Sequence, residues 1–268
     1  MSGLPILKDS ALTLVDRVAT LIFKRDDVRN ALTGTELTAE IVATLAWANT
    51  SPDVSVLVLT GEGSAFSAGG NIKTMGERAK ASPHVLQQNY KQGIQRIPLA
   101  LQEIDIPVVA AVNGPAIGAG FDLVNMCDIR IGSTLAQFGE TFVNLGIIAG
   151  DGGAWFLQRL IGYQRAAELT FTGRIIKADE ARQLGILLEV TEPEALLPRV
   201  QELAAKVAAK PPLALRYAKR LLKLAQQQPL SEHLELCSSY QALCHKTADH
   251  AEALSAFFEK RQGKYEGR

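Results

Sequence analysis

The chain has 268 residues, of which 47% are apolar and 21% charged, and its formal net charge is zero. This composition is typical of a globular protein and excludes extensive disorder. A neutral chain has no overall attraction to nucleic acid or to an anionic membrane surface. The N-terminal residues predict neither a signal nor a transit peptide, and no apolar run is long enough to cross a membrane. The three cysteines lack metal-type spacing, so we expect a cytoplasmic protein without a metal site.

The first half of the chain alternates between strand-like and helix-like patterns. An alternating stretch from Leu12 to Phe23 predicts a β-hairpin that bends at Val15 and Asp16. Continuous apolar runs of strand length predict strands that are buried on both faces. The further strands are expected at 54–61, 107–113 and 128–131, and the helices at 35–48, 85–104 and 120–126. This order favours an α/β architecture.

Beyond Tyr163 the pattern becomes mostly helical. Helices are expected at 164–170, 178–184, 194–209, 213–226 and 231–260. Pro211 and Pro212 separate two of these helices, because the residue before a proline is disfavoured in the helical conformation. The last part of the chain is therefore predicted to be a helical region.

Two glycine-rich turns carry the strongest functional signal. They read SAFSAGGNIKTM, from Ser64 to Met75, and AAVNGPAIGAGFDLVNMCDIR, from Ala110 to Arg130. Each turn stands between an extended run and a helical pattern, so a ligand can approach the backbone while the helix start directs free N–H groups outward. Two such donors can stabilise a carbonyl oxygen that becomes an enolate, and nearby Asp122 indicates proton transfer beside it. Taken singly, each turn favours the simpler interpretation, a tight connection in a sheet.

In this order and at this separation, the two turns resemble the signature of the crotonase superfamily, which includes enoyl-CoA hydratases and isomerases. The resemblance runs from about Leu14 to Tyr265 and includes AQFGETFVNLGIIAGDGGAWFLQRLIG and the closing AFFEKR. It implies an α/β fold with a crotonase-like ββα spiral core and a C-terminal helical region. The implied boundaries are 1–195 for the core, with its acyl-CoA site, and 196–268 for the helical trimerisation region.

The resemblance also assigns site residues. The backbone N–H groups of Gly70 and Ala119 would form an oxyanion hole for the thioester carbonyl. Asp122 stands where hydratases of the family carry the first of two glutamates, in a segment more similar to dienoyl-CoA isomerases, although it could instead cap its helix. The second glutamate aligns with Phe142, which cannot exchange a proton and would line the substrate pocket. Glu140, two residues earlier, is an alternative second acid, and it is equally compatible with a solvated or structurally paired side chain.

Asp151, in the turn IIAGDGGAW, resembles an aspartate that isomerases of the family carry one position earlier, where this chain has Gly150. If Asp122 and Asp151 face each other across the acyl chain, one removes a proton from carbon and the other returns one elsewhere, which moves a double bond. If both hold one water molecule, the same pair supports hydration. The alternative is an Asp-Gly turn in which Asp151 bonds only its own backbone.

A nucleotide-bearing substrate needs cationic contacts. Lys24, Arg25 and Arg29 lie where the family binds the adenosine phosphates, and each is equally compatible with a solvated surface charge. Ala68 matches a backbone contact to the adenine, and Lys260 matches a lysine that reaches the coenzyme A 3′-phosphate from a neighbouring subunit. Coenzyme A is part of the substrate, so the resemblance implies no separate cofactor and no metal. The expected partners are an acyl-CoA and further copies of the chain, in a trimer or hexamer, without nucleic acid or membrane.

The resulting hypothesis is an acyl-CoA enzyme that stabilises a thioester enolate and either moves a double bond or adds water to an enoyl-CoA. Two alternatives stay open on the same scaffold. One is a non-catalytic binding protein, favoured by the missing second glutamate and disfavoured by the neutral charge and retained glycine turns. The other is an acyl-CoA hydrolase, because an oxyanion hole serves many enolate chemistries.

Overall fold

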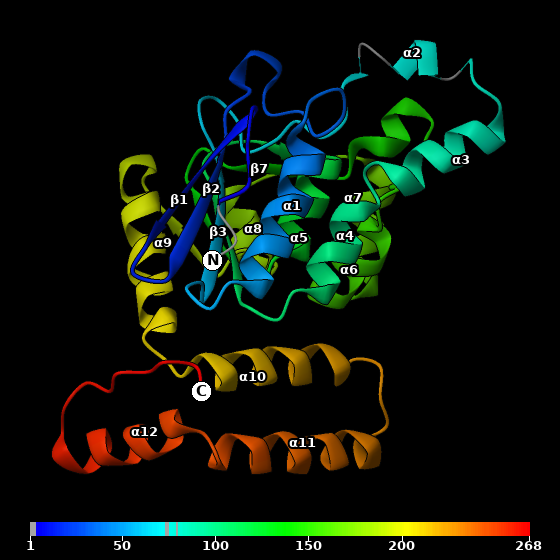
Figure 1. The fold of residues 1–268 in the computed structure, drawn as a ribbon. Helices are drawn as coiled ribbons and strands as arrows, with labels where there is room; N and C mark the ends of the chain where they lie inside the picture. Colours follow the sequence, from blue (N-terminus) through cyan, green and yellow to red (C-terminus); the bar gives the residue numbers. More distant parts are fainter. Residues whose placement is uncertain (1–3, 73–74, 79) are drawn as a thin grey trace.

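The computed structural model describes residues 4–72, 75–78 and 80–268 (Figure 1). Within these residues, a larger sheet has six strands in the order β1-β2-β3-β4-β6-β9, and a smaller sheet has the order β5-β7-β8. Strands β1 and β2 are antiparallel, whereas each neighbouring pair from β2 to β9 is parallel. The larger sheet comprises β1 (Ser10–Val15), β2 (Val18–Phe23), β3 (Val56–Gly61), β4 (Val108–Val112), β6 (Ile129–Ser133) and β9 (Glu189–Thr191). The smaller sheet comprises β5 (Ala116–Ile117), β7 (Gln137–Gly139) and β8 (Ile175–Lys177).

Helices surround both sheets, and the last helix ends at Glu259. The helices before the C-terminal region are α1 (Leu37–Thr50), α2 (Met75–Arg78), α3 (Pro83–Gln92), α4 (Arg96–Glu103), α5 (Ala119–Met126), α6 (Gly153–Ile161), α7 (Tyr163–Thr172) and α8 (Ala178–Gln183). The later helices are α9 (Pro193–Ala208), α10 (Pro212–Leu224), α11 (Leu230–His245) and α12 (Ala248–Glu259). The 3₁₀ turns η1 (Asp26–Val28) and η3 (Thr141–Leu145) are also present. Among the described residues, no helix is long and apolar enough to cross a membrane.

Both faces of the larger sheet are buried, as the continuous apolar runs predict. Successive strand residues point to opposite faces. Leu57 and Leu59 of β3 therefore join the main core with residues of α1, α4 and α5, whereas Val56 and Val58 pack in a second cluster with α9. Figure 1 shows α9 on one side of the sheet and α1 with α5 on the other. The parallel strands thus present their carboxyl ends, and the loops that follow them, at one edge of a rigid core.

The hairpin between β1 and β2 turns one residue later than predicted. Val15 pairs with Val18, and the two central residues of the turn are Asp16 and Arg17, with φ of +47° and +68°. A tight hairpin turn of this kind requires two left-handed residues. Aspartate tolerates that conformation, whereas β-branched Val15 is strongly disfavoured in it.

Two helices predicted as continuous are each divided in the structure. The stretch 85–104 forms α3 and α4, because a proline at position 98 inside one helix would clash with the carbonyl of Ile94, whereas Pro98 fits the first turn of α4. The stretch 231–260 forms α11 and α12. There the Thr247 side chain accepts a hydrogen bond from the His250 N–H and caps the start of α12.

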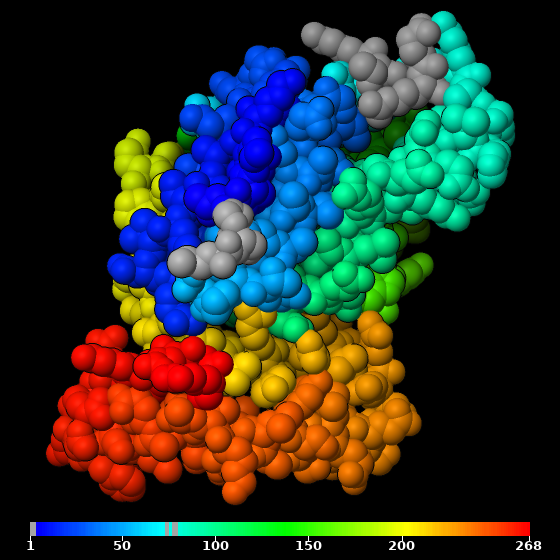
Figure 2. Space-filling view, viewed as in Figure 1, coloured from blue at the N-terminus to red at the C-terminus, as the bar shows by residue number. Residues whose placement is uncertain are grey.

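The last three helices form a layer beneath the rest of the molecule (Figure 2). Helix α10 attaches through basic side chains: Lys223 donates hydrogen bonds to the Leu101, Gln102 and Ile104 carbonyl oxygens at the end of α4, at 2.7 to 3.0 Å. Burial lowers the pKa of Lys223 to about 8. A cation at a helix C-terminus is stabilised by the helix dipole. The predicted boundary after residue 195 stays a prediction; it falls within α9, which packs on the larger sheet.

Candidate active site

A cavity of about 640 Å³ lies at the carboxyl ends of β3 and β4, beside the loops that follow these strands. This is the edge at which α/β sheets bind ligands, because several loops converge there. The cavity brings together residues that are far apart in the sequence. The predicted site residues that line it are Ala68, Gly70, Ala119, Phe142 and Asp151.

The loop that contains Gly70 passes tightly against the start of α5. Gly69 has a φ of +74°, and a Cβ there would lie 2.4 Å from the Ile117 carbonyl oxygen and 2.8 Å from the Ala119 nitrogen. Only glycine allows this approach. Ala119 begins α5, so its N–H is one of the unpaired donors at the positive end of that helix. Within the described chain, neither the Gly70 nor the Ala119 N–H donates a hydrogen bond to another residue.

Asn30 holds the loop after β3 in place. Its fully buried side chain donates hydrogen bonds to the carbonyl oxygens of Glu62, at 3.1 Å, and Ala65, at 2.9 Å. The Ser67 hydroxyl donates in turn to the Asn30 carbonyl, at 2.7 Å. Backbone groups of a buried loop must find such partners. The position of the Gly70 amide is therefore set by contacts that do not involve a substrate.

Three carboxyl groups meet beside this cavity. Asp122 lies on α5, Glu140 follows β7 and Asp151 precedes α6, and their exposed fractions are 0%, 1% and 4%. Both oxygens of Asp122 and of Glu140, and Oδ1 of Asp151, have no hydrogen-bond donor among the described residues. Ionised carboxylates have no proton to donate. Hydrogen bonds among the three carboxyl groups therefore form only when at least one of them is protonated. No cluster of His, Cys, Asp or Glu in the described ranges is arranged to bind a metal.

The cluster holds protons more tightly than free carboxyl groups do. Burial, followed by the charges of Asp151 and Glu140, raises the pKa of Asp122 well above its usual value. Burial also raises the pKa of Asp151, and it raises the pKa of Glu140 to about 7. Hydrogen bonding to a protonated Asp122 lowers the pKa values of Glu140 and Asp151 in part. Asp122 is therefore the proton donor within the cluster.

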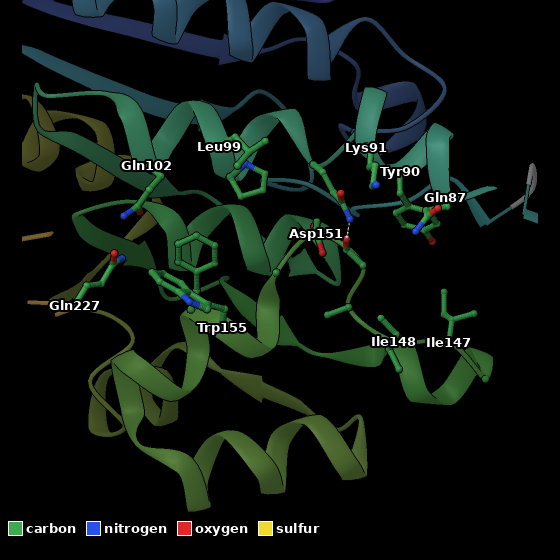
Figure 3. Close-up of a pocket in the computed structure, with 17 residues that line it drawn as sticks. Gln87, Tyr90, Lys91, Leu99, Gln102, Ile147, Ile148, Asp151, Trp155 and Gln227 are labelled. Atoms are coloured by element: carbon green, nitrogen blue, oxygen red, sulfur yellow. Dashed lines mark hydrogen bonds between the residues drawn. The ribbon is translucent and has the colours of Figure 1, made fainter. Parts of the chain in front are cut away.

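Asp151 is the member of the cluster that lines the cavity, whereas Asp122 and Glu140 lie behind it. The corner between α3 and α4 braces the Asp151 turn. Gln95 Nε2 donates a hydrogen bond to the Gly150 carbonyl oxygen at 2.7 Å, and a Cβ on Gly150 would lie 2.5 Å from the Tyr90 ring. Figure 3 shows Tyr90 and Asp151 on the wall of a neighbouring cavity.

Asp122 packs against the start of α6, where only a glycine leaves room. A Cβ on Gly153 would lie 2.1 Å from Asp122 Oδ1. We expect Gly153→Ala to lower the free energy of unfolding by about 1–3 kcal/mol, because the carboxyl group must move within a packed core. Gly76→Ala is the matched control, since a Cβ there meets nothing within 4 Å. Thermal unfolding of both variants checks this; equal melting temperatures would contradict the contact.

The basic residues predicted to contact the nucleotide lie outside the cavity, whereas Ala68 lines it. Lys24 forms an ion pair with Glu62 at 3.2 Å, and Arg29 follows η1 in a left-handed conformation. Lys260 ends α12 in the C-terminal layer. Ala68 lines the cavity, and its N–H donates to the Arg29 carbonyl oxygen at 2.8 Å. The roles of these residues toward coenzyme A stay predictions.

The contacts of Tyr90 and Gln95 with the Asp151 turn were not predicted from the sequence. Tyr90 and Gln95 lie in a stretch that was interpreted only as a helix. Pro98 was a usable signal, because it predicts a break in that helix and hence a corner whose side chains leave the regular pattern. The contact between Gly153 and Asp122 had no local signal, because it joins two helices that are distant in the sequence.

This fold, with its free amides and buried carboxyl groups at the strand ends, is that of a crotonase-type protein. The chain belongs to the enoyl-CoA hydratase/isomerase family, because the model of that family matches residues 15–268. It is an enzyme of the enoyl-CoA hydratase/isomerase type. The predicted superfamily and fold class are therefore confirmed.

Individual relatives agree with this assignment. The chain is 34% identical over 251 residues to crotonyl-CoA hydratase of Syntrophomonas wolfei, covering 93% of this chain and 95% of the relative. It is 31% identical to 1,2-epoxyphenylacetyl-CoA isomerase of Escherichia coli, covering 94% and 95%. Among solved structures, a putative enoyl-CoA hydratase from Streptomyces coelicolor A3(2) superimposes with a TM-score of 0.92 at 33% identity, covering 100% of this chain and 98% of that one.

Proposed function

We propose that this enzyme isomerises an enoyl-CoA by moving its double bond toward the thioester. The observation that supports this proposal most is the arrangement of one cavity-lining carboxyl group, Asp151, beside the two free amides of Gly70 and Ala119. A single carboxyl group is sufficient to carry a proton from one carbon to another. Coenzyme A enters as part of the substrate, and no separate cofactor is needed.

The reaction begins with an ionised Asp151. Its carboxylate takes a proton from Cα of a β,γ-unsaturated thioester, and the electron pair moves toward the thioester oxygen to form a dienolate. The Gly70 and Ala119 N–H groups stabilise this oxygen, each by roughly 3 kcal/mol in a site of this kind. Asp151 then returns the proton to Cγ, and the double bond lies between Cα and Cβ. The raised pKa of Asp151 makes it a better base than a free carboxylate.

Asp122 and Glu140 support this step from behind the cavity. The Asp122 proton forms a hydrogen bond toward Asp151, which stabilises the ionised form of Asp151 that the first step requires. The position of the second hydratase glutamate is occupied by Phe142, whose ring lies 3.4 Å from where a Cβ on Gly118 would be. Phe142 is therefore a wall of the substrate site and takes no part in proton transfer.

Hydration of an enoyl-CoA is the second candidate. It is favoured by the names of relatives, which include short-chain-enoyl-CoA hydratase of Clostridium acetobutylicum, 35% identical to this chain, and 2,3-dehydroadipyl-CoA hydratase of Escherichia coli, also 35% identical. Water addition requires a second group that activates water. Asp122 and Glu140 would have to reach the cavity to serve in that role.

We further propose that coenzyme A phosphates bind to Lys24 and Arg29, and to Lys260 of a neighbouring copy. A trimer or hexamer is then part of the complete site, because Lys260 lies in the C-terminal layer, away from the cavity of its own chain. A cytoplasmic location is proposed with this function. A family member without catalytic activity and an acyl-CoA hydrolase are the outcomes that the experiment must distinguish.

Mass spectrometry of β,γ- and α,β-enoyl-CoAs incubated with the enzyme in H₂¹⁸O tests the reaction. We expect the double bond to move without any gain in mass. A product that carries one ¹⁸O-labelled water would establish hydration instead, and release of free coenzyme A would establish hydrolysis. Unchanged substrates, together with measurable acyl-CoA binding, would favour a non-catalytic protein.

A further inference from the structure

A second cavity, of about 900 Å³, adjoins the cavity described above. The two cavities share Tyr90, Ile147, Gly150 and Asp151 as wall residues. Figure 3 shows this second cavity between α4 and α6, with Asp151 near its middle and Trp155 further along. We call it the distal groove. Its wall includes Asp151, the carboxyl group that we place beside the reacting carbons of the substrate.

The walls of the distal groove are mostly apolar. Pro98 and Leu99 of α4 line the groove together with Trp155 and Phe156 of α6. The rings of Trp155 and Phe156 make an edge-to-face contact with centroids 4.7 Å apart, and Figure 3 shows Leu99 and Trp155 on the groove wall. At the end away from Tyr90, the side chains of Gln102 and Gln227 approach each other (Figure 3). Charged wall residues within the described chain are limited to Lys91 and Asp151. A ligand of this groove therefore has an apolar body.

We propose that the distal groove binds the far end of an extended apolar acyl chain, so that the preferred substrates are medium- to long-chain acyl-CoAs. This inference rests on the proposed function, because it places the thioester oxygen at Gly70 and Ala119 and the reacting carbons at Asp151. The carbons beyond them then reach the wall that the two cavities share. A volume of 900 Å³ suits a drug-sized ligand and is much larger than the end of a four-carbon acyl group requires.

Exposed apolar side chains on the groove wall support binding of an acyl chain. Leu99 is 63% exposed in the unliganded chain, and Ile148 is 73% exposed. An acyl chain that covers them removes apolar surface from water on both partners. Each methylene that is fully buried increases affinity by about fourfold, so a longer chain gains affinity until the groove is filled.

Binding of saturated acyl-CoAs to the full-length enzyme tests the groove without requiring catalysis. We expect isothermal titration calorimetry to give a Kd for decanoyl-CoA that is at least about tenfold lower than that for butyryl-CoA. In Leu99→Trp, the larger indole narrows the groove at the wall that Leu99 forms. We expect the preference for decanoyl-CoA to fall below about threefold while butyryl-CoA binding is unchanged. Leu188→Trp is the matched control, because Leu188 is 64% exposed and lines neither cavity.

The other outcomes separate the failure of the groove from the failure of the proposed function. Equal affinities for the two acyl-CoAs, in an enzyme that isomerises enoyl-CoAs, would reject the groove but keep the proposed function. Failure to bind either acyl-CoA would reject both. If Leu99→Trp instead changes the molar mass measured by light scattering, the groove is a contact between copies of the chain. A preference for decanoyl-CoA without isomerisation would retain the groove and reject the reaction.

Discussion

Replacing Asp151 with asparagine is expected to lower kcat by about 1,000-fold, because the cavity then has no carboxyl group that exchanges a proton with the substrate. KM should change little, since asparagine keeps the shape of the side chain. In the wild-type enzyme, kcat should rise with pH through a value above 3.8, because burial raises the pKa of Asp151 and its ionised form is the base. Steady-state kinetics with a β,γ-enoyl-CoA measures both effects.

Asp179→Asn is the control for this substitution, because Asp179 is an exposed aspartate on α8 outside both cavities. It should leave kcat unchanged. The opposite assignment of the acids has a clear signature. If Asp122→Asn abolishes turnover while Asp151→Asn retains most of it, Asp122 is the base and our placement of the substrate is wrong.

Replacing Glu140 with glutamine is expected to stabilise the enzyme by about 3 kcal/mol above pH 7. The pKa of Glu140 is about 7 in the folded chain, against 4.5 ordinarily. The folded state therefore keeps a proton that the unfolded state loses, so the contribution of Glu140 is fully present below pH 4.5 and is lost as pH rises toward 7. Glutamine has no charge to bury, so the variant does not lose stability in this way as pH rises.

Urea unfolding across this pH range measures the difference between the two proteins. The stability of wild type and Glu140→Gln should converge near pH 4.5 and separate as pH rises. Glu103→Gln, at an exposed position of α4, should follow wild type to within about 0.5 kcal/mol. A constant difference at all pH values would show that Glu140 acts through packing and not through its charge.

The sequence predicted the elements that position the site more fully than the contacts within it. Strands β3 and β4 were identified because their apolar runs are continuous, and the two glycine turns because glycine is required where Gly69 meets α5. The cluster of Asp122, Glu140 and Asp151 could not be derived in the same way. Its members lie on separate elements, and their meeting depends on how α5 packs against α6.

Which of the three acids lines the cavity could not be predicted from the sequence either. The sequence left open whether Asp122 and Asp151 face each other across the acyl chain. In the structure Asp151 lines the cavity, whereas Asp122 is fully buried behind it. Burial decides this difference, and burial depends on the whole fold. Glu140 was an alternative second acid from its spacing to Phe142, and its structural place is behind the cavity, next to Asp122.

The most direct test of the central claim, that one carboxyl group carries the proton, is a single turnover of a β,γ-enoyl-CoA in D₂O followed by NMR spectroscopy of the product. If Asp151 takes the proton from Cα and returns it to Cγ, the product carries less than one deuterium at Cγ and no added water. One full deuterium at Cγ would contradict the direct return of the proton that Asp151 takes from Cα. A deuterated 3-hydroxyacyl product would contradict the isomerase proposal altogether.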